Sequence, residues 1–365
     1  MSDLDPASPP VDPTPPPPAA PSDLAARAAA LRAARPGLRI RDLAKALGVG
    51  ELHLLDLDRG PDVLPLRGTP AELLGAASTV GRCMALTRND TAVHERKGDY
   101  LDVRFEAHVG LVLGPDIDLR VFPAHWAAAR AVRATIHGRP RQSLQFFDAH
   151  GDAVHKVYLE AESAPGAWDA LVARFADPTA PTPAPAGPRP ARPHTPIAPA
   201  PDFLDQWAAL RDTHDFFGLL RRHQLSPADA FAAAAGRFSN AVPTDTLHRL
   251  LLACAETGVP IMVFVGNPGC IQIHTGPIHR VSLAGPWVNV LDPDFNLHVD
   301  TAQVRGAWAV CKPTTDGPVH SLELLDDAGE VSVRVFGARK PGRPEDPRWV
   351  EVLDAVGARA PGGGA

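Results

Sequence analysis

The chain has 365 residues, 45% of them hydrophobic, and a formal net charge of −6 without a long basic run. This length can support two domains with a sizeable core, whereas nucleic-acid binding is not expected, because phosphate neutralisation needs clustered lysine and arginine. No stretch of about 18 apolar residues occurs, so no membrane-spanning helix is expected.

Two proline-rich tracts divide the chain. Residues 1–22 are acidic and proline-rich, which predicts a disordered tail. They hold neither the basic nor the apolar segment of a secretory signal, so we expect a cytoplasmic protein. Residues 177–202 have the same character and predict an extended linker. The expected domains are therefore residues 23–176 and 203–357, followed by a flexible tail at 358–365.

Each half begins with predicted helices and continues with predicted strands. Residues 25–49 are alanine-rich with helical spacing, and Ser226 is a candidate N-cap in the second half. Residues 116–122 alternate apolar and polar side chains, as a half-buried strand does. Residues 143–159 predict a hairpin that turns at His150–Gly151. Helices followed by runs of strands favour an α+β fold, in which each half forms a large antiparallel sheet with flanking helices.

The two halves repeat each other at a constant offset of 178 residues. Met84 aligns with Met262 and Asn89 with Asn267. The same offset holds through the predicted hairpin, whose second copy turns at Ala328–Gly329. One offset that continues over about 75 residues indicates the tandem duplication of a single domain.

The four cysteines do not form a recognisable motif. No CxxC pair occurs, which argues against a structural zinc site, a thioredoxin-type site or a c-type cytochrome. We expect buried thiols in a reducing compartment. The residues are Cys83, Cys254, Cys270 and Cys311.

His214 lies in an apolar stripe that begins after the linker. Phe203, Trp207, Leu210, His214 and Phe217 follow each other at steps of four and three, which predicts that they share one face of a helix. The histidine is then either a core residue that donates to a backbone carbonyl or a neutral imidazole offered to a metal or haem iron. The spacing by itself does not decide between these two roles.

Three cations are further candidates. Arg120 shares a strand face with Asp118 and Phe122, and its guanidinium is either solvated or a clamp for a carboxylate. Lys312 ends a predicted strand, and Arg339 follows another. Their simplest explanation is an ordinary surface position.

Other catalytic and metal-binding motifs are absent from the sequence. It contains no nucleophile elbow, zinc-protease motif, P-loop or dinucleotide-binding loop. Several histidines of the first half lack the spacing of metal ligands, and we expect most of them to be solvated or in turns. They are His94, His108, His125, His137, His150 and His155.

Six separated segments together resemble one family, the bacterial cytoplasmic haem-degrading factors, also called hemin-transport or haem-trafficking proteins. The resemblance extends roughly over residues 25–355, and the segments agree with the family in order and spacing. They are residues 84–95, 110–122, 143–159, 212–223, 260–276 and 308–326.

The resemblance implies a tandem repeat with a haem cleft between the halves and His214 as the iron ligand. Two positions depart from the family: a family arginine falls on Pro227, and a tyrosine is replaced by Phe336. The implied cofactor-binding residues are Arg120 as a distal-side contact, Phe264 as a packing contact on the macrocycle, Lys312 and Arg339 as propionate or pocket-wall cations, and Phe122 and Phe336 as further pocket positions.

The function implied is the handling of internalised haem b. The protein would bind haem and, given an electron donor, degrade it or release its iron, with Arg120 as the candidate distal residue. The alternative is a non-catalytic carrier that stores haem and delivers it to a separate haem oxygenase. An inner-membrane haem transporter is a further possible partner. A third hypothesis, a β-rich interaction module whose motifs belong only to the core, predicts no haem binding.

Overall fold

The computed structural model describes residues 21–136, 138–181, 183–184, 194–340 and 342–362. The predicted tail at 1–22 lies outside these residues except for its last two, where a helix begins at Pro21. His137, much of the predicted linker and the last three residues of the chain also lie outside them.

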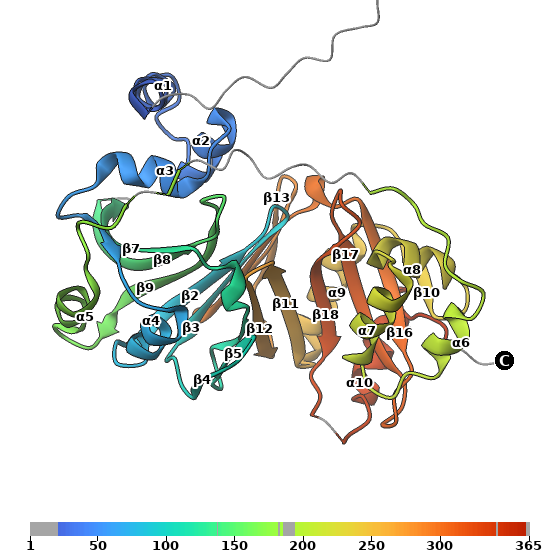
Figure 1. Ribbon diagram of the computed structural model, residues 1–365. Helices are drawn as coiled ribbons and strands as arrows, with labels where there is room; N and C mark the ends of the chain where they lie inside the picture. The colour runs from blue at the N-terminus through green and yellow to red at the C-terminus, as the bar shows by residue number, and fades with distance from the viewer. Residues whose placement is uncertain (1–20, 137, 182, 185–193, 341, 363–365) are drawn as a thin grey trace, which may run out of the picture.

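Two nine-stranded antiparallel sheets form the body of the molecule (Figure 1). Sheet A has the order β1-β7-β8-β9-β2-β3-β15-β14-β13, and sheet B has the order β10-β16-β17-β18-β11-β12-β6-β5-β4. The first-half strands are β1 Val63–Leu66, β2 Gly81–Arg88, β3 Ala92–Gly98, β4 Val103–Glu106, β5 Val109–Leu113, β6 Asp118–Val121, β7 Ala128–Ile136, β8 Arg139–Phe147 and β9 Ala153–Ser163. The second-half strands are β10 Ser239–Val242, β11 Ile261–Asn267, β12 Cys270–Gly276, β13 Val281–Ala284, β14 Trp287–Leu291, β15 Phe295–Asp300, β16 Gly306–Lys312, β17 Val319–Leu325 and β18 Val331–Gly337.

The predicted α+β class with large antiparallel sheets is confirmed, but the halves exchange strands. Each sheet takes six strands from one half and three from the other. The exchange is made where β3 pairs with β15 and where β12 pairs with β6. Neither sheet is therefore complete without the other half of the chain.

Helices lie on both faces of each sheet (Figure 1). Among the described residues, no helix is long and apolar enough to cross a membrane. The helices are α1 Pro21–Ala34, α2 Ile40–Leu47, α3 Glu51–Leu55, α4 Pro70–Ala77, α5 Ala167–Phe175, α6 Phe203–Ala208, α7 Asp215–His223, α8 Pro227–Ala233, α9 Thr246–Thr257 and α10 Pro347–Ala355, with short 3₁₀ turns η1 Asp56–Asp58, η2 Pro123–His125 and η3 Thr301–Gln303.

The duplication seen in the sequence is repeated in the structure. Strands β13 and β14 begin and end 178 residues after β4 and β5, as β12 does after β3. The predicted hairpins are also present, since β8 and β9 pair around His150–Gly151 and β17 and β18 pair around Ala328–Gly329. Ser226 caps α8 as predicted, and its hydroxyl accepts the backbone N–H of Asp229.

A reciprocal pair of asparagines joins the two halves. The Asn89 side chain donates to the carbonyls of Gly266 (3.0 Å) and Ser332 (2.8 Å). Its repeat partner Asn267 donates to the carbonyls of Arg88 (2.9 Å) and Val154 (2.8 Å). The acceptors are related by the same offset of 178 residues as the asparagines. These matching hydrogen bonds of Asn89 and Asn267 indicate an approximate two-fold axis between β2 and β11.

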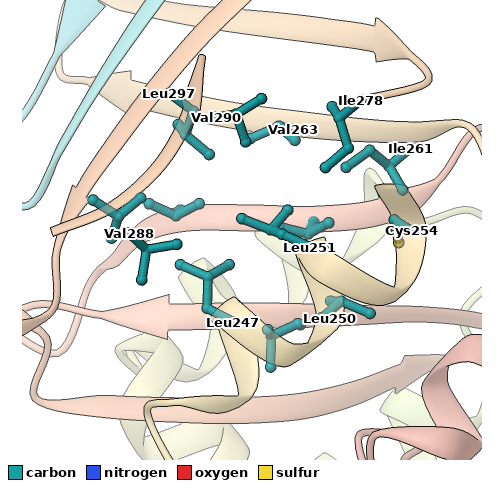
Figure 2. Packing of buried hydrophobic residues seen from close by; sticks show 14 of the residues in the cluster. Leu247, Leu250, Leu251, Cys254, Ile261, Val263, Ile278, Val288, Val290 and Leu297 are labelled. Carbon is teal, nitrogen blue, oxygen red and sulfur yellow. The ribbon is translucent and has the colours of Figure 1, made fainter. Parts of the chain in front are cut away.

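Helix α9 covers one face of sheet B (Figure 2). Leu247, Leu250 and Leu251 are fully buried against Val263 of β11 and Val288 of β14. Burying one such side chain contributes about 1.5–3 kcal/mol. Because β14 belongs to sheet A, this core also holds the two sheets together.

All four thiols are free and buried, so the predicted burial of the cysteines is confirmed. Beyond α10 the chain keeps contact with the body of the protein. Ala358 and Ala360 are buried, the latter beside Cys311 of β16.

Candidate functional site

His214 does not lie on an apolar helix face, and that prediction is wrong. Helix α6 ends at Ala208, and His214 is the residue immediately before α7. Trp207 is fully buried, whereas the side chain of His214 is 90% exposed. The helix breaks between them, so the apolar spacing continues across a loop and the imidazole faces outward.

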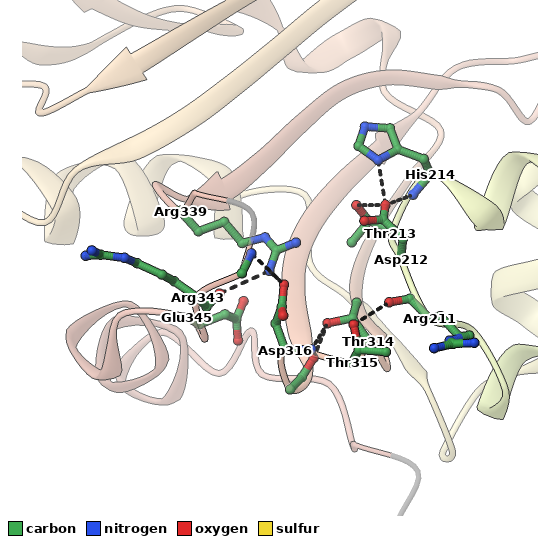
Figure 3. Close-up of polar contacts among 12 residues, drawn as sticks. Arg211, Asp212, Thr213, His214, Thr314, Thr315, Asp316, Arg339, Arg343 and Glu345 are labelled. Carbon is green, nitrogen blue, oxygen red and sulfur yellow. Dashed lines mark hydrogen bonds and ion pairs between the residues drawn. The ribbon is translucent and has the colours of Figure 1, made fainter.

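Asp212 orients the imidazole of His214 (Figure 3). The ring Nδ1 lies 2.5 Å from the Asp212 carboxylate, which also accepts the His214 backbone N–H at 2.8 Å. The backbone N–H of His214 holds the pKa of the Asp212 carboxyl below its usual value, and the His214 ring and Arg339 act in the same direction. In the neutral tautomer in which Nδ1 donates to this carboxylate, Nε2 carries an unshared lone pair directed away from Asp212.

Arg339 lies in the loop after β18, across from the segment that holds Asp212 and His214. Its guanidinium is 3.9 Å from the Asp316 carboxylate and donates to the carbonyl of Arg343 at 3.4 Å. The loop at Asp316 is tied to the histidine segment, because the backbone N–H of Thr315 donates to the Arg211 carbonyl at 3.0 Å (Figure 3). Arg339 is thus held near Asp212 with 13% of its side chain exposed.

Sheet B presents a half-buried apolar surface beside α7. In the ladder, Arg334 of β18 lies opposite Phe264 of β11, and Phe264 lies opposite Ile273 of β12. Directly opposed residues point to the same face of a sheet. By the same pairing, Met262 and Phe336 form the neighbouring row. Phe264, Met262 and Phe336 remain partly exposed, and the rings of Phe264 and Phe336 meet edge to face at 5.5 Å.

Lys312 is buried on this face and is not the surface lysine that its sequence position favoured. Its ammonium pairs with Glu323, whose other oxygen accepts the Arg334 Nε–H at 2.9 Å. Burial alone would raise the pKa of Glu323, but Lys312 and Arg334 hold it at about 2. Burial also lowers the pKa of Lys312. The ammonium lies 4.8 Å from the centre of the Phe216 ring and 5.5 Å from that of Phe336.

Arg120 lies on the same face but on the exchanged strand β6. It is opposite Ile271 in the ladder and pairs with the carboxylate of Asp118, as the predicted alternation implied. Strands are about 4.8 Å apart, so β6 is roughly 14 Å from β18 across the sheet. Phe122 follows the end of β6, where its backbone N–H donates to the Gly269 carbonyl at 2.9 Å.

The fold therefore brings Arg120, Phe264, Lys312 and Phe336 to one face of one sheet. His214 and Arg339 lie at the α7 end of this face. Sequence reasoning missed the partners Asp212, Glu323 and Arg334. The last two could have been found, because residues equally far from the Ala328–Gly329 turn oppose each other in a hairpin.

The prediction that the scattered histidines of the first half are solvated is wrong for two of them. His94 and His155 are 0% and 1% exposed. Burial lowers the pKa of His94 well below its usual value and that of His155 to about 3. Both lie on strands, whose inward positions the sequence did not distinguish.

Comparisons with known proteins agree with this architecture. The sequence profile of the haemin-degrading HemS/ChuX domain matches residues 48–175 and again residues 224–356. The hemin transport protein HmuS of Yersinia pestis is 37% identical over 329 residues, which cover 88% of this chain and 94% of that protein.

Two solved structures are similar over nearly their whole length. Holo-PhuS, a haem-binding protein from Pseudomonas aeruginosa, superposes with a TM-score of 0.84 at 42% identity, covering 94% of this chain and 100% of that chain. The haem-degrading enzyme ChuS of Escherichia coli gives a TM-score of 0.84 at 33% identity, with 92% and 99% covered.

Proposed function

Because this chain belongs to the haemin-degrading HemS/ChuX domain family, we propose that it binds haem on the face of sheet B, with His214 as the axial ligand. A hemin transport protein, a haem-binding protein and a haem-degrading enzyme are its relatives by sequence or structure. The four buried free thiols suit a reducing compartment, so we place the protein in the cytoplasm.

The His214–Asp212 pair is the observation that carries this proposal. Histidines that bind a metal nearly always donate their second ring N–H to a carboxylate, a backbone carbonyl or water. His214 has this arrangement, with Nδ1 on Asp212 at 2.5 Å and 90% of its side chain exposed. A histidine that only filled the core would not present an unshared nitrogen to solvent.

The neighbouring surface fits the other parts of a haem. Phe264, Met262 and Phe336 offer an apolar area for the porphyrin plane, which water solvates poorly. Arg339 and Arg334 at the α7 end are cations for the propionates. Lys312 is already engaged by Glu323, so its contribution is the positive charge it adds beneath the aromatic rings rather than a free clamp.

We place haem degradation first among the possible outcomes of binding. Bound haem supplies the oxidative chemistry when an electron donor and dioxygen or peroxide are present. The protein's own part is to hold the iron through His214, to shield one porphyrin face on sheet B, and to provide hydrogen-bond donors from Arg120. None of these roles requires a protein nucleophile.

Haem transport without degradation is the second candidate, and the exposure of His214 favours it. A ligand at the start of a surface helix can be reached by another protein, whether an inner-membrane transporter that supplies haem or a haem oxygenase that receives it. Rapid exchange between proteins needs such access.

A hemin titration followed by absorbance tests the site. Wild-type protein should give a Soret band at saturation. His214→Ala should weaken binding at least about tenfold, or about 1.4 kcal/mol, and alter the spin-state bands. His223→Ala, at the other end of α7, is the matched control and should behave as wild type. Equal affinity and spectra in wild type and His214→Ala would show that the iron is held elsewhere.

Turnover separates the two candidates. Haem-loaded protein is incubated with ascorbate, with and without catalase. A defined tetrapyrrole product and free iron in the presence of catalase identify an enzyme. Bleaching that catalase abolishes identifies a carrier whose haem is attacked by peroxide.

A further inference from the structure

A chain of four polar side chains is enclosed in the core between the sheets. The Tyr100 hydroxyl lies 2.6 Å from Nε2 of His155, and Nδ1 of His155 lies 2.8 Å from the Thr87 hydroxyl. The Thr87 hydroxyl is in turn 3.6 Å from the sulfur of Cys270. None of the four residues is more than 1% exposed.

The donor and acceptor in each of these hydrogen bonds follow from the bond between Thr87 and Cys270. The Thr87 hydroxyl donates to the Cys270 sulfur, so its oxygen is left to accept the Nδ1–H of His155. Nε2 of His155 is then unprotonated and accepts the phenolic proton of Tyr100. Burial lowers the pKa of His155 to about 3, so the ring is neutral at physiological pH and remains an acceptor.

The duplicated fold does not need this chain. At the positions 178 residues later, the second half has Val265, Ile278 and Val333, all fully buried in the core. The same place in the fold is thus filled by hydrocarbon in one half and by hydroxyl and imidazole groups in the other. A buried polar group costs free energy unless it is hydrogen-bonded. Because the second half fills the same place with hydrocarbon alone, packing does not by itself account for the polar set.

The polar chain ends directly behind the proposed haem surface. Cys270 of β12 is opposite Val121 of β6, and Val121 lies between Arg120 and Phe122. Val121 and Cys270 are buried in the core with Tyr100, whereas Arg120 points to the other face of sheet B. Tyr100 therefore packs on the inner side of the same sheet whose outer face carries Arg120.

We propose that Tyr100 is a redox-active tyrosine whose proton is accepted by His155. Tyr100 reduces the oxidant that arises when bound haem is exposed to peroxide. This inference rests on the proposed function. Bound haem would supply a one-electron oxidant in the presence of peroxide, and Tyr100 gives one electron to it. The O–H bond of Tyr100 breaks, and its proton forms a bond to Nε2 of His155. The products are a neutral tyrosyl radical, an imidazolium and the singly reduced oxidant.

The proton transfer is favourable despite the buried imidazole. A phenol that has lost an electron is a far stronger acid than imidazolium, even where burial holds the pKa of His155 at about 3. The electron donor of haem degradation can restore the phenol, because its electron reduces the radical while the proton returns from His155. In this way Tyr100 protects the side chains of the proposed haem surface from oxidation.

Electron paramagnetic resonance with two oxidants tests this inference. Haem-free protein is flashed with a ruthenium polypyridyl photo-oxidant and persulfate, and hemin-loaded protein is treated with hydrogen peroxide and frozen. A neutral tyrosyl radical is expected from both samples. The chain has only two tyrosines, so Tyr100→Phe should lose the signal and Tyr158→Phe should keep it.

His155→Val tests the proton acceptor, and it copies the residue of the second half. This variant keeps Tyr100 but removes the base, so the radical yield should fall in both samples. Melting curves confirm that each variant is folded. An unchanged tyrosyl signal in Tyr100→Phe, or no signal in the peroxide sample despite bound hemin, overturns the inference. A failure to bind hemin would instead overturn the proposed function, and the photo-oxidant sample would still decide whether Tyr100 is oxidised.

Discussion

The two halves share one backbone plan but present different surfaces. Across sheet B, one row runs through Arg334, Phe264 and Ile273, and the corresponding row of sheet A runs through Lys156, Leu86 and Glu95. Opposite Ile271 lies Arg120, whereas the corresponding position of sheet A is His298, paired with Val93. Both rows begin with a cation, Arg334 or Lys156, but Ile273 of the second half is replaced by Glu95 in the first. The row of sheet B is therefore the more apolar of the two.

The helices that lie beside these surfaces differ in the same way. Helix α2 is followed by Gly48 and helix α7 by Gln224, and both of these C-cap residues have the left-handed conformation. Counting back ten residues from each puts Leu38 in the place of His214. Duplication therefore supplied two equivalent places, and side chains rather than topology distinguish them: only one holds the histidine that we propose as the iron ligand.

The largest effect is expected at the pair of asparagines that the two halves have in common. Asn89→Ala and Asn267→Ala should each cost about 3 kcal/mol of unfolding free energy, because each leaves two carbonyls without a donor. Urea unfolding measures both. Asn296→Ala removes a single long hydrogen bond of 3.4 Å and serves as the control, at under about 0.5 kcal/mol. A large cost at only one asparagine would refute the symmetric arrangement.

The next prediction concerns the ion pair between His320 and Glu345, both of which belong to the second half. Burial alone would lower the pKa of His320, but Cys311 and Glu345 outweigh it and raise the pKa to about 9. Because the folded pKa exceeds the usual 6.5, stability is complete below pH 6.5 and falls as the pH rises through 9.

Denaturant unfolding at several pH values measures this loss, which should be about 3 kcal/mol between pH 6.5 and 9.5. Glu345→Gln should flatten the profile, since the carboxylate that accepts from His320 Nδ1 at 2.8 Å is lost. Glu351→Gln on α10 is a control of equal charge change. The same slope in Glu345→Gln and wild type would assign the alkaline loss to other groups.

In the first half the sign is reversed. The folded pKa of His155 lies at about 3, below its usual 6.5, so stability is complete above pH 6.5 and falls as the pH drops toward 3. The unfolded chain takes up the proton first, which contributes up to about 1.4 kcal/mol per pH unit. The triple variant Thr87→Val, Tyr100→Ile and His155→Val copies the second half and should have a shallower acid slope. Slopes that coincide would contradict the assignment to His155.

The smallest expected effect concerns the partner of the ligand. Asp212→Asn removes the carboxylate that orients His214 but leaves this proposed ligand in place. Loss of such a partner weakens metal binding by about 10-fold or somewhat more. Hemin titration measures this, with Asp205→Asn as control, because Asp205 lies on α6 and its carboxylate is 3.4 Å from Arg237 rather than beside His214. Affinity equal to wild type in Asp212→Asn would mean that Asp212 does not set the tautomer.

Local patterns were sufficient for the duplication, the hairpins and the N-cap at Ser226. These features depend on residues close together in the chain, or on the comparison of one half with the other. The resemblance of separated motifs also directed attention to His214, Phe264 and Arg120, which the fold places around one surface of sheet B.

The exchange of strands, the exposure of His214 and the burial of Lys312 and His155 depend on contacts between distant segments. The apolar spacing placed Trp207 and His214 on one helix, although a loop separates them. Spacing does not show where a helix ends. Lys312 looks like a surface residue until Glu323 and Arg334 are brought beside it. Pairing energies between residues far apart in the chain appear only once the sheets are assembled, and they decide which polar groups are enclosed and which face outward.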